Sequence, residues 1–160
     1  MAKQNRKESY EPRIENRRAY HDYLITDKVE CGIVLGGSEV KSIRSGRVNL
    51  AEGYADINPR TRELWLLNVD IALYPQAPRS HLQRAPRKLL AHKREINRLE
   101  KASSVKGATL IPLAMYFVEG RVKVEIGLAT GKQEHDKRNT SKEREARKEI
   151  QRGMTKKKIG

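Results

Sequence analysis

Two histidine–aspartate pairs are the residues of this chain best suited to chemistry. His21 precedes Asp22, and His135 precedes Asp136. Such pairs can bind divalent metals in phosphohydrolases, but those sites need further His and Asp ligands from a packed helical scaffold. Here the first pair opens an apolar, strand-like stretch and the second lies in a segment almost free of apolar residues. The pattern therefore disfavours metal-dependent hydrolysis.

Other catalytic and cofactor signals are missing from the sequence. It has no G-x-x-x-x-G-K-[ST] loop, no G-x-G-x-x-G after a strand, no H-E-x-x-H and no G-x-S-x-G. The single cysteine, Cys31, excludes an internal disulfide and a cysteine-based metal cluster within one chain, and its apolar neighbours predict a small buried hydrophobe. We expect no enzymatic activity and no cofactor.

The formal net charge of +14 points to a polyanionic partner. Residues 131–160 carry net +6 and residues 1–18 net +3, so both ends are more basic per residue than the middle. A membrane partner would need a broad apolar helix face with aromatic anchors, and no apolar run approaches the roughly 20 residues that span a bilayer. The first 13 residues have no hydrophobic core and so no secretory signal. We expect a cytoplasmic protein.

The elements that must position these side chains are mostly strands. Apolar and β-branched runs predict strands within 21–35, 48–57, 63–71 and 108–131, the last as a hairpin that turns at Glu119-Gly120. Many short strands with Gly and Pro turns favour a sandwich or a closed barrel, and small barrels with one or two helices commonly bind oligonucleotides.

Two helices and one loop complete the expected domain. A short helix is predicted over 38–46 and a longer one over 87–104, with Pro86 in its first turn. The helical face of the longer segment would hold Leu89, His92, Ile96 and Leu99, which makes His92 a histidine at the edge of the core. Residues 70–88 are rich in proline and are expected to form a mobile surface loop.

Single residues in this domain have mostly structural interpretations. Trp65 and Phe117 lie in strands and are expected in the core, while Tyr20 and Tyr23 could serve either the core or base stacking. Glu39 is expected in a surface salt bridge. The aromatic-rich sheet of an RRM or cold-shock domain is absent from the sequence, which argues against ordinary single-strand reading by stacking.

The chain should divide into a disordered segment over 1–15, a folded domain over 16–130 and a basic tail over 131–160. After Thr130 there is no Leu, Val, Phe, Tyr or Trp. Thr140 and Glu143 fit a capping box, and Glu143 and Arg147 are spaced for an ion pair on a helix. This tail is predicted to be disordered when free and helical on an anionic partner. A solvated, solubilising tail is the alternative.

Several stretches together resemble the family of SsrA-binding proteins, SmpB, in the family's order and over roughly residues 16–152. They are NRRAYHDYLI (16–25), GIVLGGSEVKSIRSGRVNL (32–50), RKLLAHKREINRL (87–99), KVEIGLATGK (123–132) and HDKRNTSKEREARKEIQR (135–152). The resemblance implies a mainly β fold with flanking helices, a small closed barrel of the oligonucleotide-binding type. It also implies a non-enzymatic, monomeric adaptor that binds the tRNA-like domain of transfer-messenger RNA and delivers it to stalled bacterial ribosomes. The indirect partners would be elongation factor Tu and alanyl-tRNA synthetase.

The same resemblance implies two sets of site residues. Lys41 and Arg44 join the RNA-facing set because of their place in the predicted helix over 38–46, and Leu90 belongs to it only if its side chain is exposed. The set is Asn16, Arg17, Arg18, His21, Glu30, Lys41, Arg44, Leu90 and Lys123. The tail set would enter the empty message channel and decoding centre of the small ribosomal subunit. It is Gly131, Lys132, His135, Asp136, Lys137, Arg138, Lys142, Arg144 and Arg147.

The sequence departs from the family pattern at three positions. Gln133 stands where a second lysine is usual, Tyr20 replaces a more usual basic residue, and Ala91 replaces a frequent leucine. Two other functions stay open beside the adaptor. A structural ribosomal protein would share the basic tails and the small β domain, and a metal phosphohydrolase would use His21.

Overall fold

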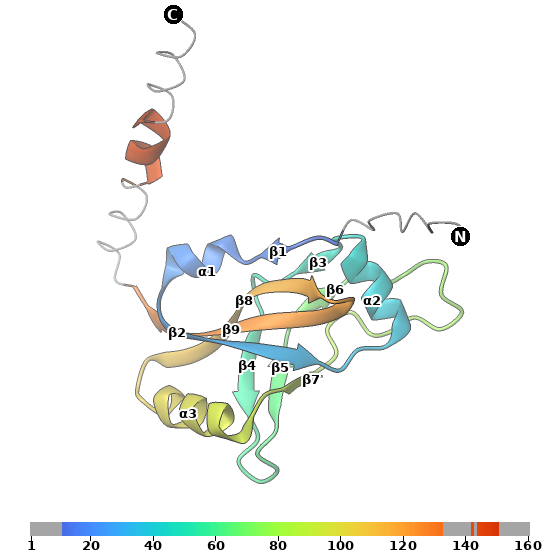
Figure 1. Ribbon diagram of the computed structural model, residues 1–160, viewed down its shortest axis with the longest axis horizontal. Coiled ribbons are helices and arrows are strands. Elements are labelled where there is room, and N and C mark those ends of the chain that lie inside the picture. Colours follow the sequence, from blue (N-terminus) through green and yellow to red (C-terminus); the bar gives the residue numbers. More distant parts are fainter. Residues whose placement is uncertain (1–10, 133–141, 143, 151–160) are drawn as a thin grey trace, which may run out of the picture.

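Strands dominate the computed structural model, which describes residues 11–132, 142 and 144–150 (Figure 1). The helices of the domain are α1 (Arg17–Asp22), α2 (Gly37–Arg44) and α3 (Lys93–Ser103). The strands are β1 (Ile14–Glu15), β2 (Tyr23–Ile33), β3 (Val48–Asn49), β4 (Tyr54–Ile57), β5 (Leu64–Leu67), β6 (Asp70–Ile71), β7 (Arg87–Leu90), β8 (Ala108–Val118) and β9 (Arg121–Gly131). None of the helices in these residues has the length and apolar character that crossing a membrane requires.

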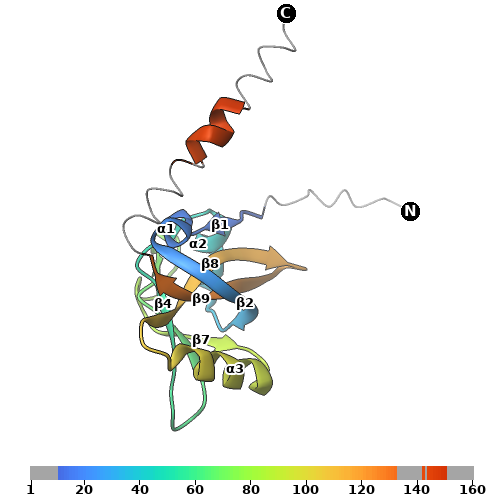
Figure 2. The ribbon, with the colours of Figure 1, turned by 90° about the vertical axis from the view of Figure 1, so that its left-hand side faces the viewer.

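Six antiparallel strands form a closed ring of hydrogen-bonded neighbours in the order β8-β4-β5-β7-β2-β9, with β9 pairing back onto β8. In two views at right angles, α1 and α2 lie on one side of the ring and α3 on the other (Figures 1 and 2). The predicted mainly β fold with flanking helices is confirmed. The assignment to the oligonucleotide-binding type stays a prediction.

The inward side chains of the ring make the core because a strand points alternate residues to opposite faces. In β9, Val122, Val124 and Ile126 are buried, as their alternation with charged residues predicted. The predicted hairpin turn at Glu119-Gly120 is confirmed, and both residues have positive φ (50° and 78°), which glycine adopts without cost. The remaining large buried residues include Ile43, Leu64, Leu66, Leu99, Leu113 and Met115.

The predicted helix over 87–104 is wrong at its start. Arg87–Leu90 forms β7, which pairs with β5 on one side and with β2 on the other, and α3 begins only at Lys93. Pairing with two distant strands outweighs the local helical spacing. Pro86 therefore precedes a strand. His92 is the exposed N-terminal cap of α3, not a residue at the edge of the core.

The expected loop over 70–88 is wrong at its two ends, which are strands of two different sheets. It begins as β6, which pairs with β3, and it ends as β7. His81 makes two hydrogen bonds of 2.9 Å, one between its Nδ1 and the Ser38 hydroxyl and one between its Nε2 and the Ile71 carbonyl. These contacts hold the loop against α2.

Arg87 is the buried anchor of this loop. Its guanidinium lies 2.9 Å from Glu39 Oε1 and donates to the carbonyls of Val69, Leu82 and Gln83. The other carboxylate oxygen of Glu39 accepts the Gly36 N–H and so caps α2. The predicted surface salt bridge of Glu39 is thus a buried one. Such a pair persists only when hydrogen bonds satisfy both partners, as they do here.

The ends of the domain also differ from the predicted boundaries. Ile14–Glu15, expected in the disordered segment, forms β1 against β8. Strand β9 runs to Gly131, beyond the boundary predicted at 130. Of the aromatic residues expected in the core, Phe117 and Trp65 are half-buried, and Phe117 packs against the core. Residues 142 and 144–150 are helical and exposed, whereas the predicted capping pair Thr140 and Glu143 lies outside the described residues.

Candidate nucleic-acid interface

An open hollow of about 420 Å³ lies where β2, β7 and β9 meet the start of α3. We call it the central hollow. Three residues of the predicted RNA-facing set, Glu30, Leu90 and Lys123, line it from strands far apart in the sequence. The complete lining is Glu30, Gly32, Leu90, Ala91, His92, Glu95 and Lys123.

Strand register at one residue brings these side chains together. Gly32 of β2 is paired with Leu90 of β7 on one side and with Lys123 of β9 on the other. Glu30 lies two residues before Gly32 and therefore points to the same face of the sheet. The outer face of three adjacent strands thus presents the isobutyl group of Leu90 and the ammonium group of Lys123 in one row, with the Glu30 carboxylate two residues away along β2.

Leu90 meets the condition set for its predicted role. Its side chain is 52% exposed, whereas that of the neighbouring Leu89 is 2% exposed. Leu90 lies over Gly32, where an added Cβ would stand only 3.3 Å from Leu90 Cβ. The missing side chain at position 32 lets Leu90 lie flat against β2. Leu90 is therefore an apolar platform open to solvent.

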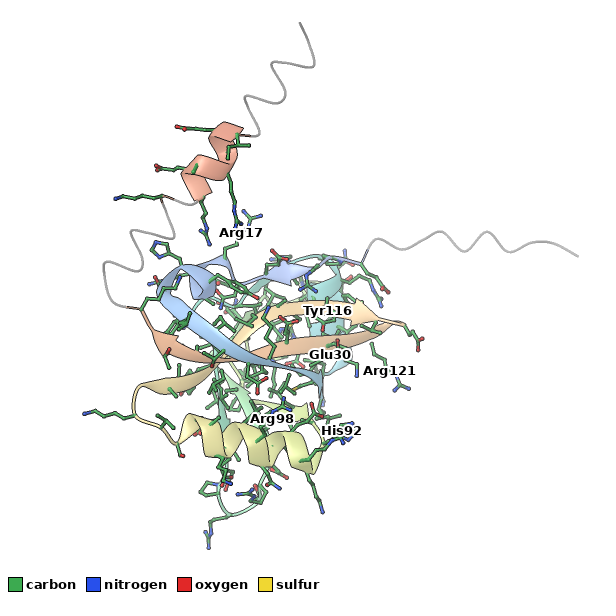
Figure 3. All side chains as sticks on the ribbon, turned by 60° about the vertical axis from the view of Figure 1, so that its left-hand side comes forward. Arg17, Glu30, His92, Arg98, Tyr116 and Arg121 are labelled. Carbon is green, nitrogen blue, oxygen red and sulfur yellow. The ribbon has the colours of Figure 1, made fainter. Side chains whose placement is uncertain are left out.

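The Glu30 carboxylate is fixed by Tyr116, a residue that no sequence motif marks as functional. The hydroxyl of Tyr116 on β8 donates to Glu30 Oε2, and the Arg13 guanidinium lies 4.7 Å from the centre of the Tyr116 ring. Burial is the larger cause, and the hydrogen bond to Glu30 the second, of a pKa of Tyr116 well above its ordinary value. The hydroxyl therefore remains a donor at neutral pH. In Figure 3, Tyr116 and Glu30 lie together between α1, which carries Arg17, and the start of α3, which carries His92.

One lysine and two carboxylates line the hollow, and the lysine makes no close ion pair with another described residue. Glu95 accepts the backbone N–H of His92 at 3.2 Å, and Arg98 anchors α3 to β2 through an ion pair with Asp27 at 3.0 Å. Within the described part of the chain, Lys123 has no carboxylate within 4.0 Å. The hollow can therefore offer one free cation, one fixed acceptor and an apolar surface. These are the groups that contact phosphates, base amino groups and base faces.

The thiol of Cys31 is not accessible as a nucleophile at this place. Cys31 lies between Glu30 and Gly32 on β2, but its side chain is fully buried, as predicted. Burial raises the pKa of its thiol to about 12. No three His, Cys, Asp or Glu side chains of the described residues form a group that could hold a metal ion.

A second basic surface surrounds α1, and we call Arg17, Arg18, His21 and Lys132 the α1 patch. Arg17 and Arg18 are exposed, and Arg18 pairs with Asp22 at 3.3 Å. His21 Nδ1 lies 2.9 Å from Asp22 Oδ1. Lys132 was predicted in the tail set, but its ammonium group donates to the Tyr20 carbonyl and its N–H to the Asp22 carbonyl. The structure therefore joins Lys132 to α1.

Asn16 is the residue of the RNA-facing set that the structure assigns to another role. It is buried, and its amide nitrogen donates to the carbonyls of Pro112 (2.9 Å) and Leu50 (3.3 Å). Its oxygen accepts the Ala19 N–H and caps α1. Both amide donors are thus in use, which leaves none for a ligand. Asn16 positions the α1 patch without facing solvent.

Lys41 and Arg44 lie on α2, outside the lining of the central hollow. Both are exposed, and each covers an aromatic ring: Lys41 Nζ is 5.3 Å from the Tyr74 ring and Arg44 Cζ is 5.4 Å from the Phe117 ring. Such cation–π contacts orient the cations while leaving them accessible.

The tail set is divided by the structure. Gly131 belongs to β9 and pairs with Tyr23. Lys142, Arg144 and Arg147 are helical and exposed. His135, Asp136, Lys137 and Arg138 lie outside the described residues, as does Gln133.

Comparisons with known proteins agree with one another. A family model described as "SmpB protein" matches residues 13–156. The SsrA-binding protein of Thermobifida fusca is 50% identical over 141 residues, which is 88% of this chain and 87% of the relative. That of Limosilactobacillus reuteri is 48% identical over 158 residues, with 96% and 98% covered. A similar solved structure, described as "tmRNA-SmpB: a journey to the center of the bacterial ribosome", has 46% identity and a TM-score of 0.65 and covers 77% of this chain and 86% of its own.

Proposed function

Because this chain belongs to the SmpB protein family, we propose that it is a non-enzymatic RNA-binding adaptor of trans-translation. It binds the tRNA-like domain of transfer-messenger RNA and brings that RNA to stalled ribosomes. The names of the similar proteins support the RNA and the ribosome as partners. The site of action is the cytoplasm, and the active form is the monomer.

The pairing of Gly32 with both Leu90 and Lys123 is the observation that most supports this function. It aligns an apolar platform and a free cation beside Glu30, whose carboxylate is fixed by Tyr116. A folded RNA offers matching groups: unstacked base faces, exocyclic amino groups and phosphates. The α1 patch supplies further cations for the RNA backbone. The ring of six strands is compatible with the oligonucleotide-binding type of barrel, which we retain as part of the proposal.

The tail has a separate role in this proposal. It enters the empty message channel of the small subunit and reaches the decoding centre, where it stands in for codon–anticodon pairing. Its net charge of +6 over 131–160 suits a channel walled by RNA. Elongation factor Tu and alanyl-tRNA synthetase act on the RNA that the protein holds and are indirect partners.

A binding titration at fixed salt tests the RNA half of the proposal. The full chain should bind the tRNA-like domain of transfer-messenger RNA far more tightly than an ordinary tRNA. Replacing Lys123 with Ala should weaken this binding and lower the slope of its salt dependence by about one. Weak and steeply salt-dependent binding to both RNAs would mean that the protein is only basic, and the proposed function would fall.

Truncation after Lys132 tests the tail half. The cut follows the last described hydrogen bond of the domain, between the Lys132 N–H and the Asp22 carbonyl. The shortened protein, first shown to be folded by its thermal transition, should keep its RNA affinity and lose the tagging of stalled chains. Loss of RNA binding would refute this division of labour.

A further inference from the structure

A second hollow, of about 450 Å³, lies on the other side of Leu90 from the central hollow. We call it the α3 hollow. It is enclosed by β7, by α3 and by the turn between β4 and β5. Its lining includes Thr61, Lys88, Leu90, Ala91, Lys93 and Ile96.

The α3 hollow is continuous with the candidate RNA interface. Leu90 and Ala91 line both hollows, so Leu90 forms a shared ridge between them. An RNA that contacts Glu30 and Lys123 can therefore extend past the Leu90 side chain into the α3 hollow. The two hollows present one surface rather than two unrelated ones.

The charges of the α3 hollow favour a single anionic group. Lys88 pairs with Glu63 at 3.2 Å, and Arg62 donates to Glu100 and Asn97 of α3. Lys93 has no carboxylate within 4.0 Å in the residues that the structure describes. It is also the first residue of α3, where the helix dipole disfavours a cation. The ammonium group of Lys93 is therefore available to an external anion at the rim of the hollow.

The size and walls of the α3 hollow suit one nucleotide. Ligand sites typically measure about 300–1,000 Å³. The isobutyl group of Leu90 and the methyl of Ala91 offer an apolar wall, and Lys93 supplies the cation at the rim. Proteins that recognise RNA sequence mostly bind unpaired, splayed bases, and an apolar wall can cover the face of such a base.

We infer that the α3 hollow is a second subsite for the RNA, which takes one unpaired nucleotide with its base against Leu90 and Ala91 and its phosphate at Lys93. The inference rests on the proposed function and deepens it. The protein then reads the RNA on both sides of Leu90.

Matched variants of the full chain test this inference on the tRNA-like domain of transfer-messenger RNA. Thr61→Trp fills the hollow from its exposed rim, and Val105→Trp adds the same ring at an exposed position outside the lining. Lys93→Ala removes the rim cation, and Lys101→Ala removes an exposed lysine of the same helix outside the lining. Thermal transitions confirm that each variant is folded.

Thr61→Trp should weaken binding about ten-fold, on the order of the loss of one bound base. Lys93→Ala should weaken it several-fold and lower the salt slope by about one, while both controls stay near the wild type. Chemical probing of the RNA should show one or two nucleotides that Thr61→Trp exposes, with the remaining protections unchanged. The inference is overturned if the wild type binds tightly and Thr61→Trp and Lys93→Ala match their controls.

Two other outcomes also overturn the inference. If Thr61→Trp keeps full RNA affinity but weakens binding to the ribosome, the occupant is a ribosomal component. If it removes every RNA protection at once, the hollow is not a separate subsite. Failure of the wild type to prefer transfer-messenger RNA over tRNA would instead refute the proposed function.

Discussion

Leu90→Ala tests whether the exposed platform of the central hollow contributes to RNA affinity. The leucine side chain is 52% exposed in the free protein, and RNA seated on the hollow would cover that remaining half. The substitution keeps the β-carbon and removes the apolar surface beyond it. It leaves Glu30 and Lys123, the polar groups of the hollow, in place.

The expected loss follows from that exposed fraction. Full burial of a leucine side chain is worth about 1.5–3 kcal/mol, and roughly half of that gain is still to be made on binding. The loss is therefore about 0.8–1.6 kcal/mol, or a dissociation constant about 4- to 14-fold higher. Stability should fall by less than the roughly 2–5 kcal/mol of a buried leucine truncation.

Titration of labelled RNA at one salt concentration measures this loss, and two other leucines serve as controls. Leu82→Ala changes a side chain that is 78% exposed and lies outside the central hollow, so affinity and stability should both stay unchanged. Leu89→Ala should lower the unfolding free energy, because this leucine is 2% exposed. Wild-type affinity in a folded Leu90→Ala protein would refute the role of the platform.

Three further predictions concern other side chains. Replacing Tyr116 with Phe frees Glu30 and should weaken RNA binding about 2- to 5-fold, the low end of a hydrogen-bond loss; unchanged affinity would show that the carboxylate needs no support. Arg87→Ala should lower the free energy of unfolding, measured by chemical denaturation, by about 3–5 kcal/mol, because the Glu39 carboxylate is left buried without its partner. Arg84→Ala breaks only exposed ion pairs and should lower it by under about 1 kcal/mol. Similar losses for the two variants would contradict the role of the buried pair. Burial raises the pKa of Cys31 from 9.0 to about 12, so the stability it contributes is complete below pH 9 and is lost as the pH rises toward 12. The unfolding free energies of wild type and Cys31→Ala should therefore converge above pH 9, and a constant difference would refute the shift.

Local sequence patterns predicted the elements whose contacts are local. The hairpin of β8 and β9 could be read from alternating residues and Glu119-Gly120, because both strands and their turn are contiguous. Arg87–Leu90 could not be read this way. The apolar spacing of these four residues continues that of α3, yet they form a strand because β2 and β5, both distant in sequence, pair with them. The same limit concealed the burial of Glu39, whose partner lies 48 residues away.

The candidate site shows a similar division. Glu30, Leu90 and Lys123 were named through the family resemblance, since no local motif links them. Their proximity depends on the register at Gly32, which is a property of the closed ring. Tyr116 was missed because one tyrosine in a hydrophobic strand carries no signal of its function. The burial of Asn16 could not be predicted, because the carbonyls that its amide group contacts belong to Leu50 and Pro112, 34 and 96 residues away.

Ring closure between β2 and β9 also has a consequence for biosynthesis. These strands come from opposite ends of the described domain, so the ring cannot form until the chain has been made as far as Gly131. Closing so long a loop is entropically costly and slow. A product that stops before Arg121 leaves both β2 and β8 with an unpaired edge, and such edges promote aggregation. We therefore expect incomplete copies of this protein to fold poorly and to lack Lys123, one of the residues of the central hollow.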